Sequence, residues 1–178
     1  AANIVVGAGS VRLIDGIIQS HVAPGEDIIN FERSFVAYEQ HARAHRRKYH
    51  IVKQTNYVCD VQNILPLASS SVRVIFIANP NNPTGTIISH GELTFLLEKI
   101  PADILVVLDE AYCEYVTDKR FPDSLSIQKK HPNLIILRTF SKIYGLAGMR
   151  IGYAVAEKEV ADILRNGRIP FFLNFLAE

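Results

Sequence analysis

Short runs of apolar, often β-branched residues alternate along this chain with longer stretches in which apolar residues recur three or four positions apart. The short runs predict strands and the longer stretches predict amphipathic helices. Several strand candidates are apolar throughout, which is typical of strands that helices cover on both faces. The pattern therefore predicts an α/β fold with a mostly parallel seven-stranded sheet and helices on both faces. The strand candidates are residues 3–6, 27–31, 49–53, 73–78, 104–108, 134–138 and 151–156.

Helix starts are marked by capping residues between these runs. Ser89 opens a capping box with the glutamate three positions on, in which each side chain accepts a hydrogen bond from the other residue's backbone amide. We also expect Ser34 and Asp60 to cap helices. Apolar stripes predict two more helices, over residues 11–22 and 157–166.

Composition excludes several classes of protein. The 178 residues fit one domain, and the formal net charge of +1 gives no field that would favour nucleic acid or an anionic membrane. No apolar run approaches the roughly 18 residues of a membrane-spanning helix. The first residues show neither a basic n-region nor a cleavage pattern, so we expect no secretory leader, and Cys59 and Cys113 make no disulfide or zinc framework. We therefore expect a soluble, cytoplasmic protein that binds neither nucleic acid nor membrane.

The segment 7–10 (Gly-Ala-Gly-Ser) follows the first strand and opens a helix. Unpaired backbone amides and the helix dipole make such a turn a site for a phosphate. A dinucleotide site is an alternative, because Glu32 stands about where a ribose-binding acid is expected, although Arg12 replaces the third glycine. A glycine turn without any ligand is a further alternative.

Two polar segments follow later strands. The two prolines of the loop 79–85 restrict its backbone, so we expect the side chains of Asn79 and Asn82 to be presented rigidly. Asp109 ends an apolar strand, and a buried carboxylate needs a partner. We expect a cationic partner for it, while a helix cap or a structural salt bridge remains an alternative.

The segment 138–150 combines hydroxyls, glycines, Lys142 and Arg150 within an apolar stretch. Desolvation and a neighbouring cation would favour the neutral amine of Lys142, which could then act as a Schiff-base nucleophile. A surface lysine is the alternative. His41 and His45 have a spacing that can hold a metal ion, but no acid completes the set and basic residues surround them, so we predict no metal site.

Taken together, in this order and each after a strand, these segments resemble the class I/II aminotransferases, pyridoxal-phosphate enzymes of fold type I. Within that family the chain is most similar to the histidinol-phosphate aminotransferases. The resemblance rests on Asn-Pro-Asn-Asn-Pro-Thr-Gly at 79–85, Asp-Glu-Ala-Tyr at 109–112 and the segment 139–150. It covers essentially the whole chain, and it implies pyridoxal phosphate as cofactor.

The resemblance also implies roles for single residues. Lys142 would join the cofactor covalently and later move a proton, and Asp109 would pair with the ring nitrogen. Asn82 and Tyr112 would hydrogen-bond the ring oxygen. Phe35 would stack on the ring, where many relatives have tyrosine. The phosphate end of the cofactor would be held by Ala8, Gly9, Ser10, Thr139, Ser141 and Arg150.

The implied reaction has a small-molecule amino donor and a 2-oxo acid as substrates, and residues 1–178 would be the large cofactor-binding domain of a homodimeric enzyme. We expect histidinol phosphate and 2-oxoglutarate to give imidazole acetol phosphate and glutamate. An aromatic amino-acid aminotransferase, a threonine-phosphate decarboxylase, an NAD-binding oxidoreductase domain and a non-catalytic regulator domain remain alternatives. Relatives carry an additional N-terminal segment and a small C-terminal domain, so we expect both to be absent from this sequence and the chain as given to be inactive.

Overall fold

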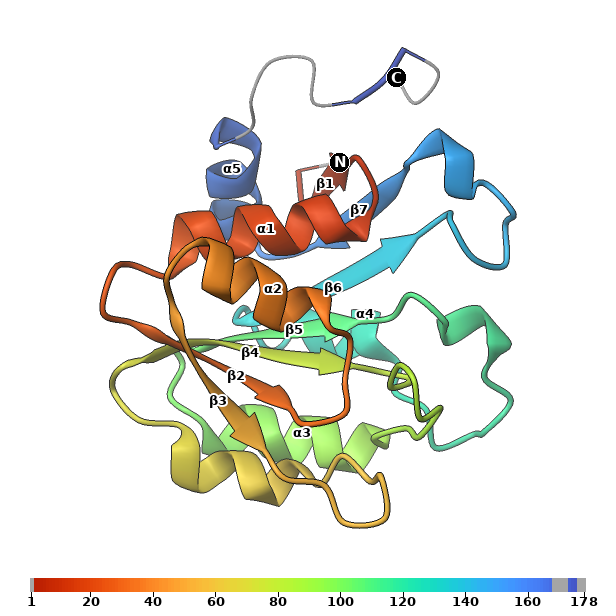
Figure 1. Cartoon of the computed structure of the whole chain (residues 1–178). Helices are drawn as coiled ribbons and strands as arrows, with labels where there is room; N and C mark the ends of the chain where they lie inside the picture. The colour runs from red at the N-terminus through yellow and green to blue at the C-terminus, as the bar shows by residue number, and fades with distance from the viewer. Residues whose placement is uncertain (1, 168–172, 176–178) are drawn as a thin grey trace.

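The seven expected strands form one sheet in the order β1-β7-β6-β5-β4-β2-β3, as seen in a computed structural model that describes residues 2–167 and 173–175 (Figure 1). Only β7 runs in the opposite direction to the other six strands, so the prediction of a mostly parallel sheet is confirmed. The strands are β1 Ile4–Gly7, β2 Asp27–Phe31, β3 Lys48–Val52, β4 Val72–Ala78, β5 Leu105–Asp109, β6 Leu134–Thr139 and β7 Gly152–Val155.

Helices cover both faces of this sheet (Figure 1). In β4, Ile75 and Ile77 pack into one apolar cluster while Val74 and Phe76 pack into the other, as expected for a strand buried on both sides. One cluster includes residues of α1 Ser10–His21, α2 Ala37–Ala44 and α5 Lys158–Asn166. The other includes residues of α3 His90–Lys99, α4 Ser124–Gln128 and the 3-10 helix η1 Val61–Leu67.

Two of the three expected helix caps are present. Ser89 and Glu92 form the complete capping box of α3. The Asp60 carboxylate accepts from the Gln62 amide, but the helix that it caps is a 3-10 helix. The expected cap at Ser34 is wrong, because α2 starts only at Ala37 and has no side-chain cap.

The carboxyl ends of six strands share one edge of the sheet, where β7 begins. Gly7, Gly152 and Thr139 lie side by side there, in neighbouring strands. A Cβ atom on Gly152 would stand 2.5 Å from the Ser10 backbone nitrogen, so only glycine lets the β1–α1 turn approach this closely. The topology thus gathers the turn at 7–10 and the segments after β4, β5 and β6 at one edge. No helix among the described residues is long and apolar enough to cross a membrane.

Candidate active site

A cavity of about 110 Å³ opens at this edge of the sheet. Most of the residues that the sequence singled out line it together, although they come from six different parts of the chain. Asp109 and Lys142, which the proposed chemistry needs in one place, both face it. The predicted residues that line the cavity are Ser10, Phe35, Asn82, Asp109, Tyr112, Thr139, Ser141, Lys142 and Arg150.

Ala8 and Gly9 are not among the lining residues, and they form the turn between β1 and α1. The Gly9 amide donates to the Gly7 carbonyl at 2.7 Å, so it is not the free donor that the sequence suggested. The helix α1 starts directly after it without a side-chain cap. Because the first amides of a helix have no intrahelical acceptor, Ser10 and Val11, which do line the cavity, carry the donors available to an anion.

Arg150 brings a cation to the same end of the cavity. Its Nη1 donates to the Ser141 hydroxyl at 3.3 Å and to the Ala147 carbonyl at 2.9 Å. The Thr139 hydroxyl accepts from the Ser141 amide at 3.1 Å, which fixes the start of the loop after β6. A guanidinium, hydroxyl groups and a helix N-terminus therefore converge in an arrangement suited to a phosphate group.

Asp109 is the acid that lines the cavity, and it is almost completely buried. Its Oδ2 accepts from the Tyr38 hydroxyl at 2.9 Å and its Oδ1 from the Ala111 amide at 3.2 Å. Burial raises the pKa of the Asp109 carboxyl to about 6, although these two donors and the charge of Lys142 act in the lowering direction. The directly bonded partner is thus a neutral tyrosine, where the sequence led us to expect a cation.

Lys142 projects over the ring of Tyr112, with Nζ 4.9 Å from the ring centroid. The expected apolar environment of this lysine is not present, because the loop from Lys142 to Gly148 is exposed. Its apolar side chains Ile143 and Leu146 are themselves exposed. Within the described residues, contact with Tyr112 and the charge of Asp109 therefore define the surroundings of Lys142 more than burial does.

Of the asparagines after β4, Asn82 faces the cavity and Asn79 does not. The Asn79 side chain is fully buried and exchanges two hydrogen bonds with the backbone of Ile88, at 2.9 and 3.2 Å. Its presentation to a ligand was therefore a wrong expectation. A wider hollow of about 920 Å³ adjoins the cavity, and the two share Pro80, Asn82 and Tyr112.

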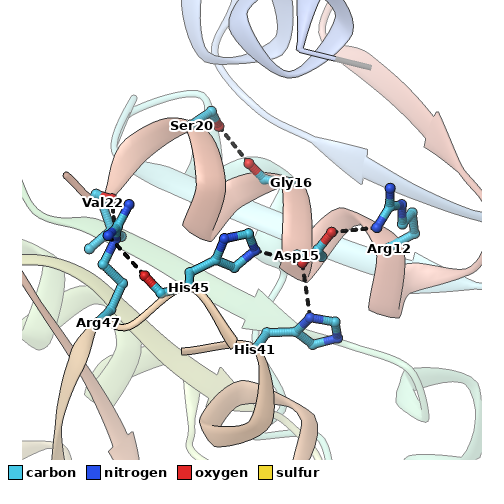
Figure 2. Close-up of polar contacts among 8 residues, drawn as sticks. All are labelled: Arg12, Asp15, Gly16, Ser20, Val22, His41, His45 and Arg47. Atoms are coloured by element: carbon cyan, nitrogen blue, oxygen red, sulfur yellow. Dashed lines mark hydrogen bonds and ion pairs between the residues drawn. The ribbon is translucent and has the colours of Figure 1, made fainter. Parts of the chain in front are cut away.

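Outside the cavity, Asp15 of α1 supplies the acid that we had considered missing beside His41 and His45 (Figure 2). Its Oδ1 contacts His41 Nδ1 at 3.0 Å and His45 Nε2 at 2.8 Å, and its Oδ2 accepts from Arg12 at 2.5 Å. Both imidazoles therefore bond to one oxygen, which joins α1 to α2. Among the described residues no group of three or more His, Cys, Asp or Glu side chains is arranged to hold a metal ion.

The cavity thus offers a buried acid, a nearby lysine and, beside Arg150, an end whose donors suit an anion. A model of the family "Aminotransferase class I and II" matches residues 1–175, and the chain belongs to this family. It is 43% identical to a histidinol-phosphate aminotransferase of Anaeromyxobacter sp. over 98% of the chain and 48% of that protein. It is 39% identical to an aromatic amino acid aminotransferase of Streptomyces coelicolor, over 99% of the chain and 50% of that protein.

The chain is also similar to a solved aminotransferase structure. Histidinol-phosphate aminotransferase from Sinorhizobium meliloti, in complex with pyridoxal-5'-phosphate, superposes with a TM-score of 0.88 at 30% identity. The match covers 94% of this chain and 46% of that one. The chain spans about half the length of the curated relatives it matches.

The NAD-binding alternative is wrong, and the topology gives the reason. In a dinucleotide-binding sheet the first strand is central and its neighbours are parallel to it. Here β1 is an edge strand and pairs only with the antiparallel β7. Glu32 follows β2, which lies near the other edge of the sheet, and it pairs with Lys53 at 2.7 Å.

Proposed function

We propose that this chain is the large cofactor-binding domain of a pyridoxal-phosphate-dependent aminotransferase that converts histidinol phosphate and 2-oxoglutarate into imidazole acetol phosphate and glutamate. The observation that carries the proposal is that Asp109 and Lys142 face one cavity, which has an anion-binding end beside Arg150. Family membership and the 43% identity to a histidinol-phosphate aminotransferase support it.

The donor set of the cavity fits pyridoxal phosphate. Asp109 is buried and has spare acceptor capacity, which suits a protonated ring nitrogen. Arg150, the Ser141 hydroxyl and the first amides of α1 suit a phosphate. Lys142 lines the same cavity and would hold the aldehyde carbon, and Asn82 and Tyr112 would hydrogen-bond the ring oxygen. When bound, the cofactor supplies an electron sink for negative charge at the substrate Cα.

The residues of this chain then have separate tasks in the reaction. The Asp109 carboxylate keeps a cation in place at the bottom of the cavity. The Lys142 amine is the base that takes a proton from the substrate Cα and returns a proton during transfer. Phe35 covers one side of the cavity, and its ring would exclude water from the reacting atoms.

Covalent labelling tests this proposal on the complete protein. Pyridoxal phosphate should produce a visible absorbance band, and borohydride should fix the label on Lys142, as peptide mass spectrometry would report. Lys142→Ala should lose both the label and turnover. Lys130→Ala, which changes an exposed lysine of the same protein, is the matched control and should keep both. Labelling at another lysine would remove the assignment.

The amino donor is the least constrained part of the proposal. An aromatic amino acid is the second candidate, because the chain is 39% identical to an aromatic amino acid aminotransferase. A threonine-phosphate decarboxylase would use the same cavity and release carbon dioxide. Steady-state kcat/KM values of the complete protein for histidinol phosphate, phenylalanine and threonine phosphate would decide, and the highest value for histidinol phosphate is expected.

We further propose that the complete enzyme is a cytoplasmic homodimer. Light scattering should give twice the chain mass, and a fully active monomer would contradict this. A non-catalytic regulator domain is the remaining alternative, and a DNA-binding domain in the complete reading frame would favour it. The net charge of +1 lends that alternative no support.

A further inference from the structure

Tyr38 lies directly behind the acid of the cavity. Its hydroxyl donates to Asp109 Oδ2 at 2.9 Å, across 71 positions of sequence. Tyr38 belongs to α2 and is completely buried, and it is not among the residues that line the cavity. It therefore reaches the site only through residues that line the cavity, and its hydroxyl reaches it through Asp109.

Packing holds the aromatic ring of Tyr38 in an orientation that directs its hydroxyl toward Asp109. It stacks on Phe76 with centroids 4.8 Å apart and an interplanar angle of 10°, and it meets the Phe35 ring edge-on at 5.6 Å. These contacts fix the ring from two sides. Burial also raises the pKa of the Tyr38 phenol well above its ordinary value, so the group remains a donor at every pH of interest.

The carboxylate of Asp109 needs this donor. It is almost completely buried beside Ala78 and Leu137 of the neighbouring strands, where the ionised form of an acid is disfavoured. The Ala111 amide serves Oδ1 and the Tyr38 hydroxyl serves Oδ2, so each oxygen has one fixed donor and keeps acceptor capacity for a ligand. A hydrogen bond to the charged form favours that form.

We propose that Tyr38 is a positioning residue that keeps the Asp109 carboxylate ionised and aligned for the cationic ring nitrogen of the cofactor. The inference rests on the proposed function, since it names the group that prepares the same site. Tyr38 touches neither substrate nor cofactor. Tyr38 therefore affects cofactor binding through the charge state of Asp109, and the size of this effect should depend on pH.

The test compares cofactor binding by the complete wild-type protein and Tyr38→Phe between pH 5.5 and 8.5. Removal of the hydroxyl raises the pKa of the Asp109 carboxyl, so the ionised form is lost at a higher pH. A shift of about one pH unit is expected for a hydrogen bond to a charged group. The dissociation constant of pyridoxal phosphate should then rise about fivefold near pH 6 and less than twofold at pH 8.5.

Tyr49→Phe is the matched control. The Tyr49 hydroxyl also donates to a carboxylate of α2, Glu39 at 2.8 Å, but neither residue lines the cavity. This variant should bind the cofactor as the wild type does at every pH. A purely structural role of Tyr38 would instead weaken binding equally at all pH values, and that result would overturn the inference. An equal pH-dependent change in Tyr49→Phe would also overturn it.

A second variant keeps the test decisive if Tyr38→Phe does not fold. Replacement of Tyr38 by 3-fluorotyrosine retains the ring and makes the hydroxyl a stronger donor. Binding near pH 6 should become tighter than in the wild type, and unchanged or weaker binding would contradict the inference.

If the wild type itself neither binds pyridoxal phosphate nor labels at Lys142, the proposed function fails. A wild type that binds, with variants that show no pH dependence, refutes only the role of Tyr38.

Discussion

The guanidinium of Arg150 occupies the space into which a side chain at position 9 would project. A Cβ atom on Gly9 would lie 2.5 Å from Arg150 Nη2. The two residues are 141 positions apart by their numbers, and one belongs to the turn before α1 while the other precedes β7. The end of the cavity at which we propose that the cofactor phosphate binds therefore depends on a glycine that leaves room for an arginine.

Gly9→Ala should damage both the fold and the site. Gly9 has φ 77° and ψ 162°, a region that is essentially restricted to glycine. We expect the free energy of unfolding to fall by about 1–3 kcal/mol, measured by chemical denaturation. Affinity for pyridoxal phosphate should fall more than about tenfold, since Arg150 must move. Gly91→Ala is the control, because nothing lies within 4 Å of its Cβ position in α3, and it should be neutral or slightly stabilising.

Asp15→Asn should loosen the contact between α1 and α2. Burial acts to raise the pKa of Asp15, but hydrogen bonds and charge from His45, His41 and Arg12 outweigh it and hold the pKa below its ordinary value. An acid whose pKa is lowered in the folded state stabilises the fold at pH values above its ordinary pKa. This contribution disappears as the pH falls through the lowered pKa. The variant should lose about 1–3 kcal/mol at pH 7 and a smaller amount below about pH 4.

Urea unfolding of both proteins at pH 7 and pH 3.5 would measure this difference. Asp103→Asn provides the control, because its carboxylate pairs with Arg73 at 3.3 Å while two-thirds exposed. Exposed pairs contribute about 0–1 kcal/mol, so this variant should change little. A loss in Asp15→Asn that is no greater than in Asp103→Asn would argue against a stabilising role for the cluster in Figure 2.

Much of the fold and part of the site could be predicted from the sequence, because local patterns specified them. The apolar runs of β4 and β5 predict buried strands, and the position of Asp109 at a strand end predicts its place at the carboxyl edge. The partners of these residues were not predictable in the same way. Tyr38 carries the same apolar periodicity as a core residue, and only the packing of α2 on the sheet directs its hydroxyl to Asp109.

The errors have the same origin. The acid nearest to His41 along the chain, Glu39, pairs with Arg43 instead, and the actual partner Asp15 is supplied by the packing of α1 against α2. Asn79 and Asn82 share one loop and one composition, yet backbone groups of the neighbouring segment satisfy Asn79 and leave Asn82 at the cavity. Spacing alone cannot decide which polar side chain meets a tertiary partner.

Arg138→Met should lower the free energy of unfolding, because it leaves the buried carboxylate of Glu110 without its cationic partner. Arg138 Nε donates to Glu110 Oε2 at 2.9 Å, Nη2 lies 2.9 Å from the same oxygen in an ion pair, and the Glu110 side chain is completely buried. Burial raises the pKa of Glu110, and Arg138 is one of the groups that oppose this. Without the arginine the pKa of Glu110 rises further, so Glu110 stays protonated in the folded state over a wider pH range. The folded state then loses stability as the pH rises through that range.

The difference in unfolding free energy between wild type and Arg138→Met should therefore grow from pH 5 to pH 8, to about 3 kcal/mol. The double variant Glu110→Leu/Arg138→Met removes both charges and should recover most of that loss, because an apolar pair can replace a buried ion pair. A double variant as unstable as Arg138→Met would show that packing of the arginine, and not its charge, is what matters.

Asp109→Asn should make the protein without cofactor more stable and the cofactor complex weaker. Because burial raises the pKa of Asp109 to about 6, the wild type loses stability as the pH rises from about 4 to above 6. Asparagine carries no charge and can still accept from the Tyr38 hydroxyl. At pH 8 the cofactor-free variant should therefore exceed the wild type by up to about 3 kcal/mol, since each unit of pKa shift corresponds to about 1.4 kcal/mol. The two should be equal near pH 4.

Pyridoxal phosphate should bind the variant at least about tenfold more weakly at pH 8, because the ring nitrogen loses its anionic partner. A gain in stability together with a loss of binding is the signature of a residue kept for a ligand at the expense of the fold. A variant that is less stable than the wild type at pH 8 would instead assign Asp109 a structural role, comparable to that of Glu110.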